Sequence, residues 1–279
     1  MRIVIISDME GISGIARWEQ VVAGQPMYEE GRRLYTEDIN AAIRGAFAGG
    51  ADEVTVMDWH GAGGGYSFNS LIPGLLDPRC SYVVQERIPQ YTEVLEAGCD
   101  GALLVGMHAM AGTPDGVMNH TVFGSSWQNL WFNGTRVGET GINAALCGVW
   151  DCPVVLVTGD EATCRQAAGL LGTGVSLLPV KKGIGRSSAV LIPPARAHQL
   201  IEEGARDAMG RVGQVQPYDP GKPCEITVEL THTSAMDELS SRPGVEVAGD
   251  RKIRSRGPDW WTAWTAFLHV SVYRPGGAR

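Results

Sequence analysis

The sequence lacks the features that mark several classes of protein. Its six cysteines include no C-x-x-C pair, so neither a zinc ribbon nor a thioredoxin-like motif is present. It has no dense cluster of Lys and Arg, and its formal net charge of -8 argues against a nucleic-acid partner. With 279 residues and 44% hydrophobic residues, the chain can bury an ample core without disulfides. We therefore expect reduced, mostly buried thiols.

Long hydrophobic runs are also absent. Gly and charged residues interrupt every apolar stretch before it reaches the roughly 20 residues that span a bilayer. The run at residues 3–6 is too short for the core of a signal peptide, and we interpret it as a strand. We therefore expect no membrane partner and predict a cytoplasmic location.

Short Val/Ile/Leu runs alternate with helical patterns along most of the chain. The runs at residues 3–7, 54–57, 102–105 and 154–157 predict buried parallel strands. Helices are predicted at about residues 28–47, 91–97, 139–149, 161–171 and 195–209. This alternation predicts an α/β fold with a mostly parallel sheet flanked by helices.

Two parts of the sequence depart from the alternation. Residues 121–123 and 130–132 look like strands, and Asn133-Gly134 favours a hairpin turn beside the main sheet. After the proline-rich residues 217–223, further strands and a closing helix at 260–270 suggest a smaller α+β subdomain. We predict a metal-binding catalytic domain at residues 1–215 and the smaller subdomain at 216–279.

Potential metal ligands follow three of the predicted strands. Asp8 and Glu10 come after the first strand, His60 after the second and His108 after the third, while Glu139 opens a predicted helix. The carboxyl ends of parallel strands meet at one edge of a sheet, where ligands usually bind. Oxygen and nitrogen donors of this mix suit Zn²⁺ or a similar ion, and three carboxylates can neutralise more than one.

The remaining histidines are not accompanied by other potential metal ligands. A single Asp or His is as often a helix cap or an ordinary polar contact as a ligand, so the argument depends on the set. His198, on a predicted helix, His232, after a strand, and His269, in the Trp-rich terminal helix, are interpreted as ordinary contacts.

Residues 7–14, Ser-Asp-Met-Glu-Gly-Ile-Ser-Gly, closely resemble the opening motif of the zinc-dependent D-aminopeptidase family. Segments at residues 30–32, 58–60, 106–109, 113–120 and 133–139 also resemble family segments, in the same order. Any one of these matches alone would be weak, but together they are specific. The carboxyl-terminal third resembles the family only in outline.

The resemblance implies a paired-zinc aminopeptidase that acts on short peptides with D-residues at the amino terminus. It implies that Asp8 bridges two zinc ions, that Glu10, His60, His108 and Glu139 complete the ligand set, and that His120 is the catalytic residue. It further implies a homodecamer of two stacked pentameric rings that encloses the active sites.

The implied chemistry is physically coherent. Two cations about 3.5–4 Å apart lower the pKa of a shared water and polarise the scissile carbonyl, so that a metal-bound hydroxide attacks. We interpret His120 as an acid/base group or oxyanion donor rather than as a nucleophile.

Two other functions stay open from the sequence. A metal-dependent phosphoesterase uses similar sites, but Arg17, Arg32 and Lys181 are the only candidates for its phosphate clamp. A non-catalytic scaffold that binds metal or peptide is the third possibility. The presence of His120 beside a full set of potential ligands counts against it.

Overall fold

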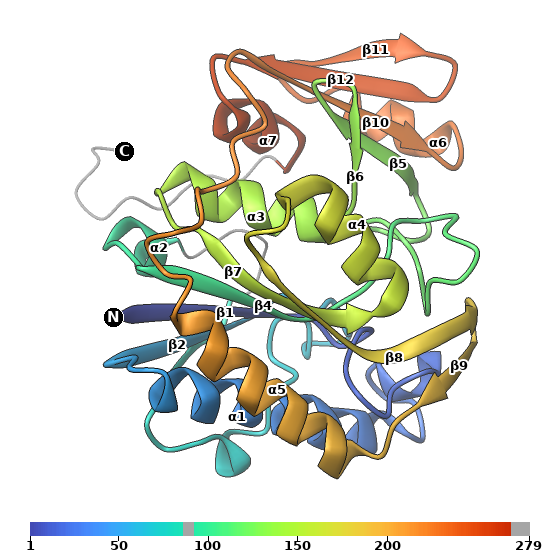
Figure 1. The fold of residues 1–279 in the computed structure, drawn as a ribbon. Helices are drawn as coiled ribbons and strands as arrows, with labels where there is room; N and C mark the ends of the chain where they lie inside the picture. The colour runs from blue at the N-terminus through green and yellow to red at the C-terminus, as the bar shows by residue number, and fades with distance from the viewer. Residues whose placement is uncertain (86–91, 269–279) are drawn as a thin grey trace.

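The computed structural model of the chain describes residues 1–85 and 92–268 (Figure 1). A seven-stranded sheet has the order β3-β2-β1-β4-β7-β8-β9, and all its neighbouring strands are parallel except β8 and β9. Its strands are β1 (Arg2–Ser7), β2 (Glu53–Asp58), β3 (Ser81–Val83), β4 (Gly101–Met107), β7 (Val154–Asp160), β8 (Ser176–Gly185) and β9 (Ser188–Leu191). The predicted α/β class with a mostly parallel sheet is confirmed.

A second, antiparallel sheet of five strands has the order β11-β12-β10-β5-β6. Its strands are β5 (Trp127–Phe132), β6 (Thr135–Val137), β10 (Cys224–Leu230), β11 (Val245–Gly249) and β12 (Lys252–Gly257). The predicted hairpin of β5 and β6 therefore pairs with a strand far along the chain. This sheet takes strands from both sides of the predicted boundary at residue 215, which stays a prediction.

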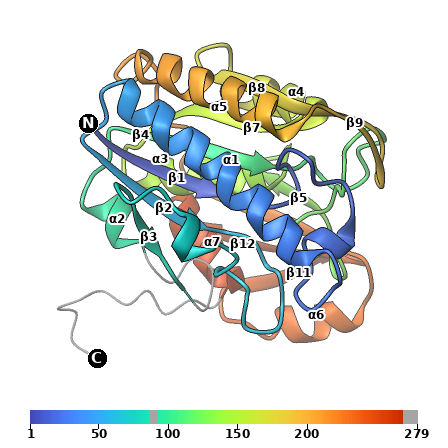
Figure 2. The ribbon, with the colours of Figure 1, turned by 90° about the horizontal axis from the view of Figure 1, so that it is seen from below.

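Helices cover both faces of the main sheet. In Figures 1 and 2, α1 and α5 lie side by side on one face, and α3 and α4 lie on the face toward the second sheet. The helices are α1 (Tyr28–Ala48), α2 (Glu93–Glu96), α3 (Glu139–Val149), α4 (Glu161–Leu171), α5 (Pro194–Met209), α6 (Ser234–Leu239) and α7 (Trp260–Leu268), with short 3-10 helices at Trp18–Gln20 and Pro73–Leu75. Among the described residues, no helix is both long enough and apolar enough to cross a membrane.

Alternating side chains of β1 supply two separate cores. Ile3 and Ile5 pack in the core beneath α1 and α5, whereas Val4 and Ile6 pack in the core shared with α3, α7 and the second sheet. A strand buried on both faces must be apolar at every position, which is why its sequence is a continuous run. Polar side chains can emerge where such a strand ends, and Asp8 directly follows the carboxyl end of β1.

The predicted strand at residues 121–123 is wrong. Val122 has φ 53°, in the left-handed region, and its N–H donates to Glu139 Oε1 at 2.8 Å. A backbone turned in this way cannot pair as an extended strand. The segment is a loop.

The helices predicted at residues 91–97 and 260–270 extend beyond the part of the chain that the structure describes. Residues 91, 269 and 270 lie outside the described residues.

The prediction that all the cysteines are reduced is also wrong. Cys99 and Cys152 form a disulfide with their Cα atoms 5.6 Å apart, a separation typical of such bonds. The two cysteines are 53 positions apart in sequence, so no local spacing motif indicates that they pair. The four other cysteines are free, and all but Cys80 are buried, as expected.

The loop after β1 passes unusually close to the end of β4. Gly11 N donates to Gly106 O at 2.8 Å, and Asp8 N donates to Val105 O at 2.9 Å. A Cβ at Gly106, which has φ +80°, would lie 2.1 Å from Asp8 O, and one at Gly11 would lie 2.0 Å from Met107 O. Only glycine fits at these two positions. The absence of a side chain there lets the two hydrogen bonds form and hold the ends of β1 and β4 together.

We expect Gly106→Ala to be strongly destabilising. The substituted residue would combine an unfavourable positive φ with a backbone clash, at a cost of about 3 kcal/mol in the free energy of unfolding. For a chain of this size that cost lowers Tm by about 5–10 °C. Gly61→Ala is the matched control, because its Cβ would meet none of the described residues within 4 Å. Equal Tm values for the two variants in calorimetry would contradict this account.

Candidate metal centre

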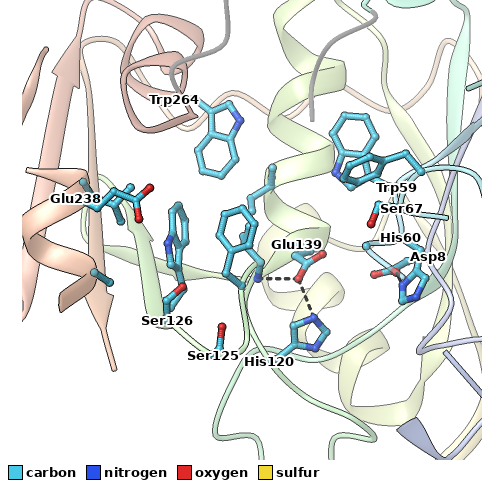
Figure 3. Close-up of a pocket in the computed structure, with 18 of the residues that line it drawn as sticks. Asp8, Trp59, His60, Ser67, His120, Ser125, Ser126, Glu139, Glu238 and Trp264 are labelled. Atoms are coloured by element: carbon cyan, nitrogen blue, oxygen red, sulfur yellow. Dashed lines mark hydrogen bonds and ion pairs between the residues drawn. The ribbon is translucent and has the colours of Figure 1, made fainter. Parts of the chain in front are cut away.

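All six residues singled out from the sequence lie together at the carboxyl edge of the main sheet. Asp8 and Glu10 follow β1, His60 follows β2, and His108 follows β4. Glu139 is the first residue of α3, whose N-terminus points at this edge. These five side chains belong to residues that are at most 9% exposed. His120 comes from the loop between β4 and β5 and approaches Glu139, as Figure 3 shows.

Asp8 lies at the centre of the cluster. Its Oδ1 is 3.1 Å from His60 Nδ1, and its Oδ2 is 3.4 Å from His108 Nε2. Glu10 Oε2 lies 3.1 Å from the same nitrogen of His60, and Glu139 Oε1 lies 3.1 Å from the same nitrogen of His108. Each half of the cluster therefore contains one imidazole and one glutamate, and Asp8 contacts both halves.

Each imidazole is oriented by a backbone carbonyl. His60 Nε2 lies 2.7 Å from Val21 O, and His108 Nδ1 lies 3.0 Å from Ala109 O. His120 Nδ1 lies 2.9 Å from Met118 O. A ring nitrogen that donates to a carbonyl fixes the tautomer, so in the neutral ring the opposite nitrogen carries a free lone pair. In all three residues that opposite nitrogen faces the carboxylates.

His120 is held between two rings. It stacks on His108 with ring centroids 4.0 Å apart, and Trp18 lies against it at 5.7 Å. Its Nε2 is 3.6 Å from Glu139 Oε1. The guanidinium of Arg186 lies 5.1 Å from the Trp18 ring and donates to Asn119 O, which ties the loop of His120 to the turn between β8 and β9.

The carboxylates of the cluster have perturbed pKa values. Burial, with the nearby charge of Glu10, raises the pKa of Asp8 to about 8. Burial also acts to raise the pKa of Glu10, but the adjacent His60 outweighs it and lowers that pKa well below its usual range. Burial is likewise outweighed at Glu139, where His108 lowers the pKa to about 2. Two glutamates are thus ionised while Asp8 competes for a proton.

The imidazoles respond in the opposite sense. Burial acts to lower the pKa of His60, but Glu10 and Asp8 raise it well above its usual value. Burial is outweighed in the same way at His108, whose pKa Glu139 raises to about 10. Burial and the charge of His108 together lower the pKa of His120. Without a metal, protons on His60 and His108 therefore offset the carboxylates, and His120 is neutral.

This donor set fits divalent metal ions. Glu10 Oε2 is buried and, among the described residues, has no hydrogen bond of proper geometry although His60 is near. Ligand atoms of Asp8, Glu10 and His108 lie within 4.8 Å of one another, as do those of His108, His120 and Glu139. Mixed carboxylate and imidazole ligands suit zinc, and a metal would replace the protons that now offset the charge.

Residues outside the cluster hold the loop that carries it. Lys181 is buried, and its Nζ donates to the carbonyl oxygens of Glu10, Ile12 and Ile15 at 2.6–2.8 Å. Burial lowers its pKa to about 8. Asp38, also buried, accepts hydrogen bonds from the N–H and hydroxyl of Ser13 at 2.7 and 2.6 Å. Sequence reasoning missed both roles, and a charged residue within an apolar strand was the only signal available for Lys181.

The cluster opens into a cavity of about 840 Å³. In Figure 3, Asp8 and His60 lie on one side of the cavity, His120 and Glu139 near its middle, and Glu238 on the opposite side. The cavity wall beyond His120 includes several apolar residues, namely Val122, Phe123, Trp127, Ala235, Leu239 and Trp264. A space of this size accommodates a small ligand.

The other candidates from the sequence lie elsewhere. His198 Nε2 is 3.3 Å from Asp38 Oδ1, and His232 lies at the cavity wall and contacts the hydroxyl of Ser234. His269 is outside the described residues. The described residues that line the cavity do not include Arg17, Arg32 or Lys181. Those three side chains therefore do not form the phosphate clamp that a phosphoesterase would need at this cavity.

Comparisons with known proteins show the family of the chain. The profile of a family described as D-aminopeptidase matches residues 1–269. A D-aminopeptidase of Bacillus subtilis (strain 168) is 32% identical over 271 residues, which cover 96% of each chain. The solved structure of the Zn-dependent D-aminopeptidase DppA from Bacillus subtilis, described as a self-compartmentalizing protease, superimposes with a TM-score of 0.89 at 31% identity over 96% of each chain. The chain belongs to the D-aminopeptidase family.

Proposed function

We propose that the protein is a zinc-dependent aminopeptidase that hydrolyses the amino-terminal residue from short peptides, with D-residues as the preferred substrates. The carrying observation is the buried cluster in which Asp8 touches two imidazole and glutamate pairs at the wall of a cavity. Membership of the D-aminopeptidase family supports the reaction and the configuration of the substrate.

In this proposal Asp8 contributes to two zinc ions. Glu10 and His60 complete one half of the ligand set, and His108 and Glu139 complete the other. When bound, such ions supply a water of lowered pKa and polarise the carbonyl of the scissile bond. The backbone carbonyl groups of Val21 and Ala109 contact the rings of His60 and His108 and keep them oriented toward the site. They also favour the tautomer whose opposite nitrogen can coordinate a metal ion.

His120 transfers the proton that hydrolysis requires. The water oxygen forms a bond to the carbonyl carbon while the C–N bond breaks, and a proton must move from that water to the leaving amine. His120 can accept this proton at Nε2 because burial lowers its pKa and keeps the ring neutral. Its Nδ1 contact with Met118 O steadies the resulting imidazolium.

A free α-amino group accounts for selection of the amino terminus, because its nitrogen can complete the coordination of zinc. Asp8, Glu10 and Glu139 all line the cavity, so metal held by them would be open to that group. An internal peptide bond of a folded protein offers no such amine. Among the described residues, Arg17, Arg32 and Lys181 do not line the cavity, so the phosphoesterase function lacks the phosphate clamp that they would have to supply.

We also propose that the chain forms a homo-oligomer, a decamer by resemblance. The structural relative is described as self-compartmentalizing, and β8 and β9 expose Ile184 and Val190, at 67% and 56% exposure, as apolar surface for a subunit contact. A cytoplasmic location stays a prediction from the sequence. The Cys99–Cys152 disulfide counts against it, because such bonds persist mainly in oxidising compartments.

Removal of metal tests the proposed function. We expect chelation to abolish hydrolysis of D-alanyl peptides and added Zn²⁺ to restore it, because the nucleophilic water depends on the metal. Zinc should also raise Tm, since it binds ligands that come together only in the folded chain. Peptidase rates and calorimetry on the same chelated samples provide the measurement. Full activity in protein shown by elemental analysis to be metal-free would refute the proposal.

Replacing His120 should affect turnover but not metal content. His120→Ala is expected to retain zinc and lose turnover by about 10²–10⁴-fold, as for loss of a general acid/base. His60→Ala and Asp8→Ala should lose both zinc and activity, and Asp8→Ala should be the more severe because Asp8 contacts both halves of the cluster. Zinc content and kcat of the three purified variants decide the roles. A zinc-free His120→Ala protein would make His120 a ligand instead.

A further inference from the structure

The cavity contains an exposed aromatic side chain that the chemistry described above does not use. Phe123 is 52% exposed and lines the cavity three residues after His120. One side of its ring meets Trp127 edge to face, with ring centroids 5.8 Å apart. Trp127 is itself buried and packs edge to face against Trp264 at 6.1 Å. Phe123 therefore stands on a fixed aromatic base and leaves much of its surface open.

The backbone holds Phe123 in this position. Val122 takes a left-handed φ of 53°, which a β-branched residue adopts only under constraint. The constraint is the hydrogen bond from its N–H to Glu139 Oε1 at 2.8 Å. On the other side, Phe123 O accepts from Ser126 N and Trp127 N, each at 2.8 Å. The loop that presents His120 thus also presents Phe123, at a cost in backbone strain.

The proposed reaction gives a bound peptide one direction. Removal of the amino-terminal residue places the scissile bond near His120 and the free amino terminus on the side of Asp8 and Glu10, which line the same cavity. Nothing precedes the first residue of the peptide, so the remaining cavity is left for the second and later residues. In Figure 3 that remainder extends from His120 past Ser126 toward Glu238, away from Asp8 and His60.

We propose that Phe123, with Trp127 and Leu239, forms an apolar subsite for the side chain of the second residue of the peptide, so that the enzyme selects peptides with a large apolar or aromatic residue there. The proposal rests on the proposed function, because the direction of binding assumes cleavage after the first residue. An apolar side chain placed against Phe123 removes surface of both groups from water, whereas glycine leaves Phe123 exposed. Burial of one such side chain favours the larger substrate by about 10–100-fold.

The test varies the second residue alone. We would measure kcat/KM for D-alanyl-glycine, D-alanyl-leucine and D-alanyl-phenylalanine with the zinc enzyme and with Phe123→Ala. The wild-type enzyme should prefer phenylalanine to glycine by at least about tenfold. In Phe123→Ala that ratio should fall to within about twofold of unity. Val247→Ala, an exposed apolar residue of β11 outside the cavity, is the matched control and should keep the parental ratio.

Three results would overturn the proposal. The first is a wild-type enzyme that does not distinguish the three peptides, and the second is an unchanged ratio in Phe123→Ala. The third is an equal loss on all substrates with Tm unchanged, which would make Phe123 a residue that only positions His120.

Failure of the proposed function looks different from these results, because no peptide would be hydrolysed at all. Titration of tryptophan fluorescence with the same peptides then decides the subsite by itself. Binding of the phenylalanine peptide about tenfold tighter than the glycine peptide, lost in Phe123→Ala, supports the subsite. Equal binding of the two peptides overturns it.

Discussion

Repulsion among three buried carboxylates is the constraint on which the rest of the site depends. Two unit charges 4 Å apart interact by about 4 kcal/mol at the effective dielectric near a protein surface, and more when buried. The carboxylate groups of Asp8, Glu10 and Glu139 would therefore move apart unless positive charge lay among them. The pKa values of Asp8, His60 and His108 are raised because protons on these groups reduce the repulsion. In the proposed enzyme zinc ions would supply that positive charge instead.

The fold also fixes the backbone that carries these side chains. Gly11 and Gly106 let the ends of β1 and β4 touch, and Lys181 gathers three carbonyl groups of the loop after β1. The imidazoles are oriented by carbonyl oxygens as well. A buried ammonium with three acceptors is well solvated by the protein, so it can brace the loop although burial lowers its pKa. The side chains of the cluster are consequently positioned before any metal or substrate arrives.

The parts that the sequence predicted are those that local patterns determine. The continuous apolar run of β1 identifies a doubly buried strand, and Asp8, His60 and His108 can be placed together because they follow such strands. The pairing of β5 with β10, the Cys99–Cys152 bond and the contacts of Lys181 join distant segments and leave no periodic signal. Val122 is of a residue type that favours a strand, but it donates a hydrogen bond to Glu139 from a left-handed backbone conformation instead.

Anomalous diffraction at the zinc absorption edge, from crystals grown with Zn²⁺, tests the central claim most directly. The account predicts two peaks in each subunit about 3.5–4 Å apart. Both should contact Asp8, one should lie with Glu10 and His60, and the other should lie with His108 and Glu139, at ligand distances of about 2.0–2.2 Å. A single peak away from Asp8, or no peak at this edge of the sheet, would contradict it.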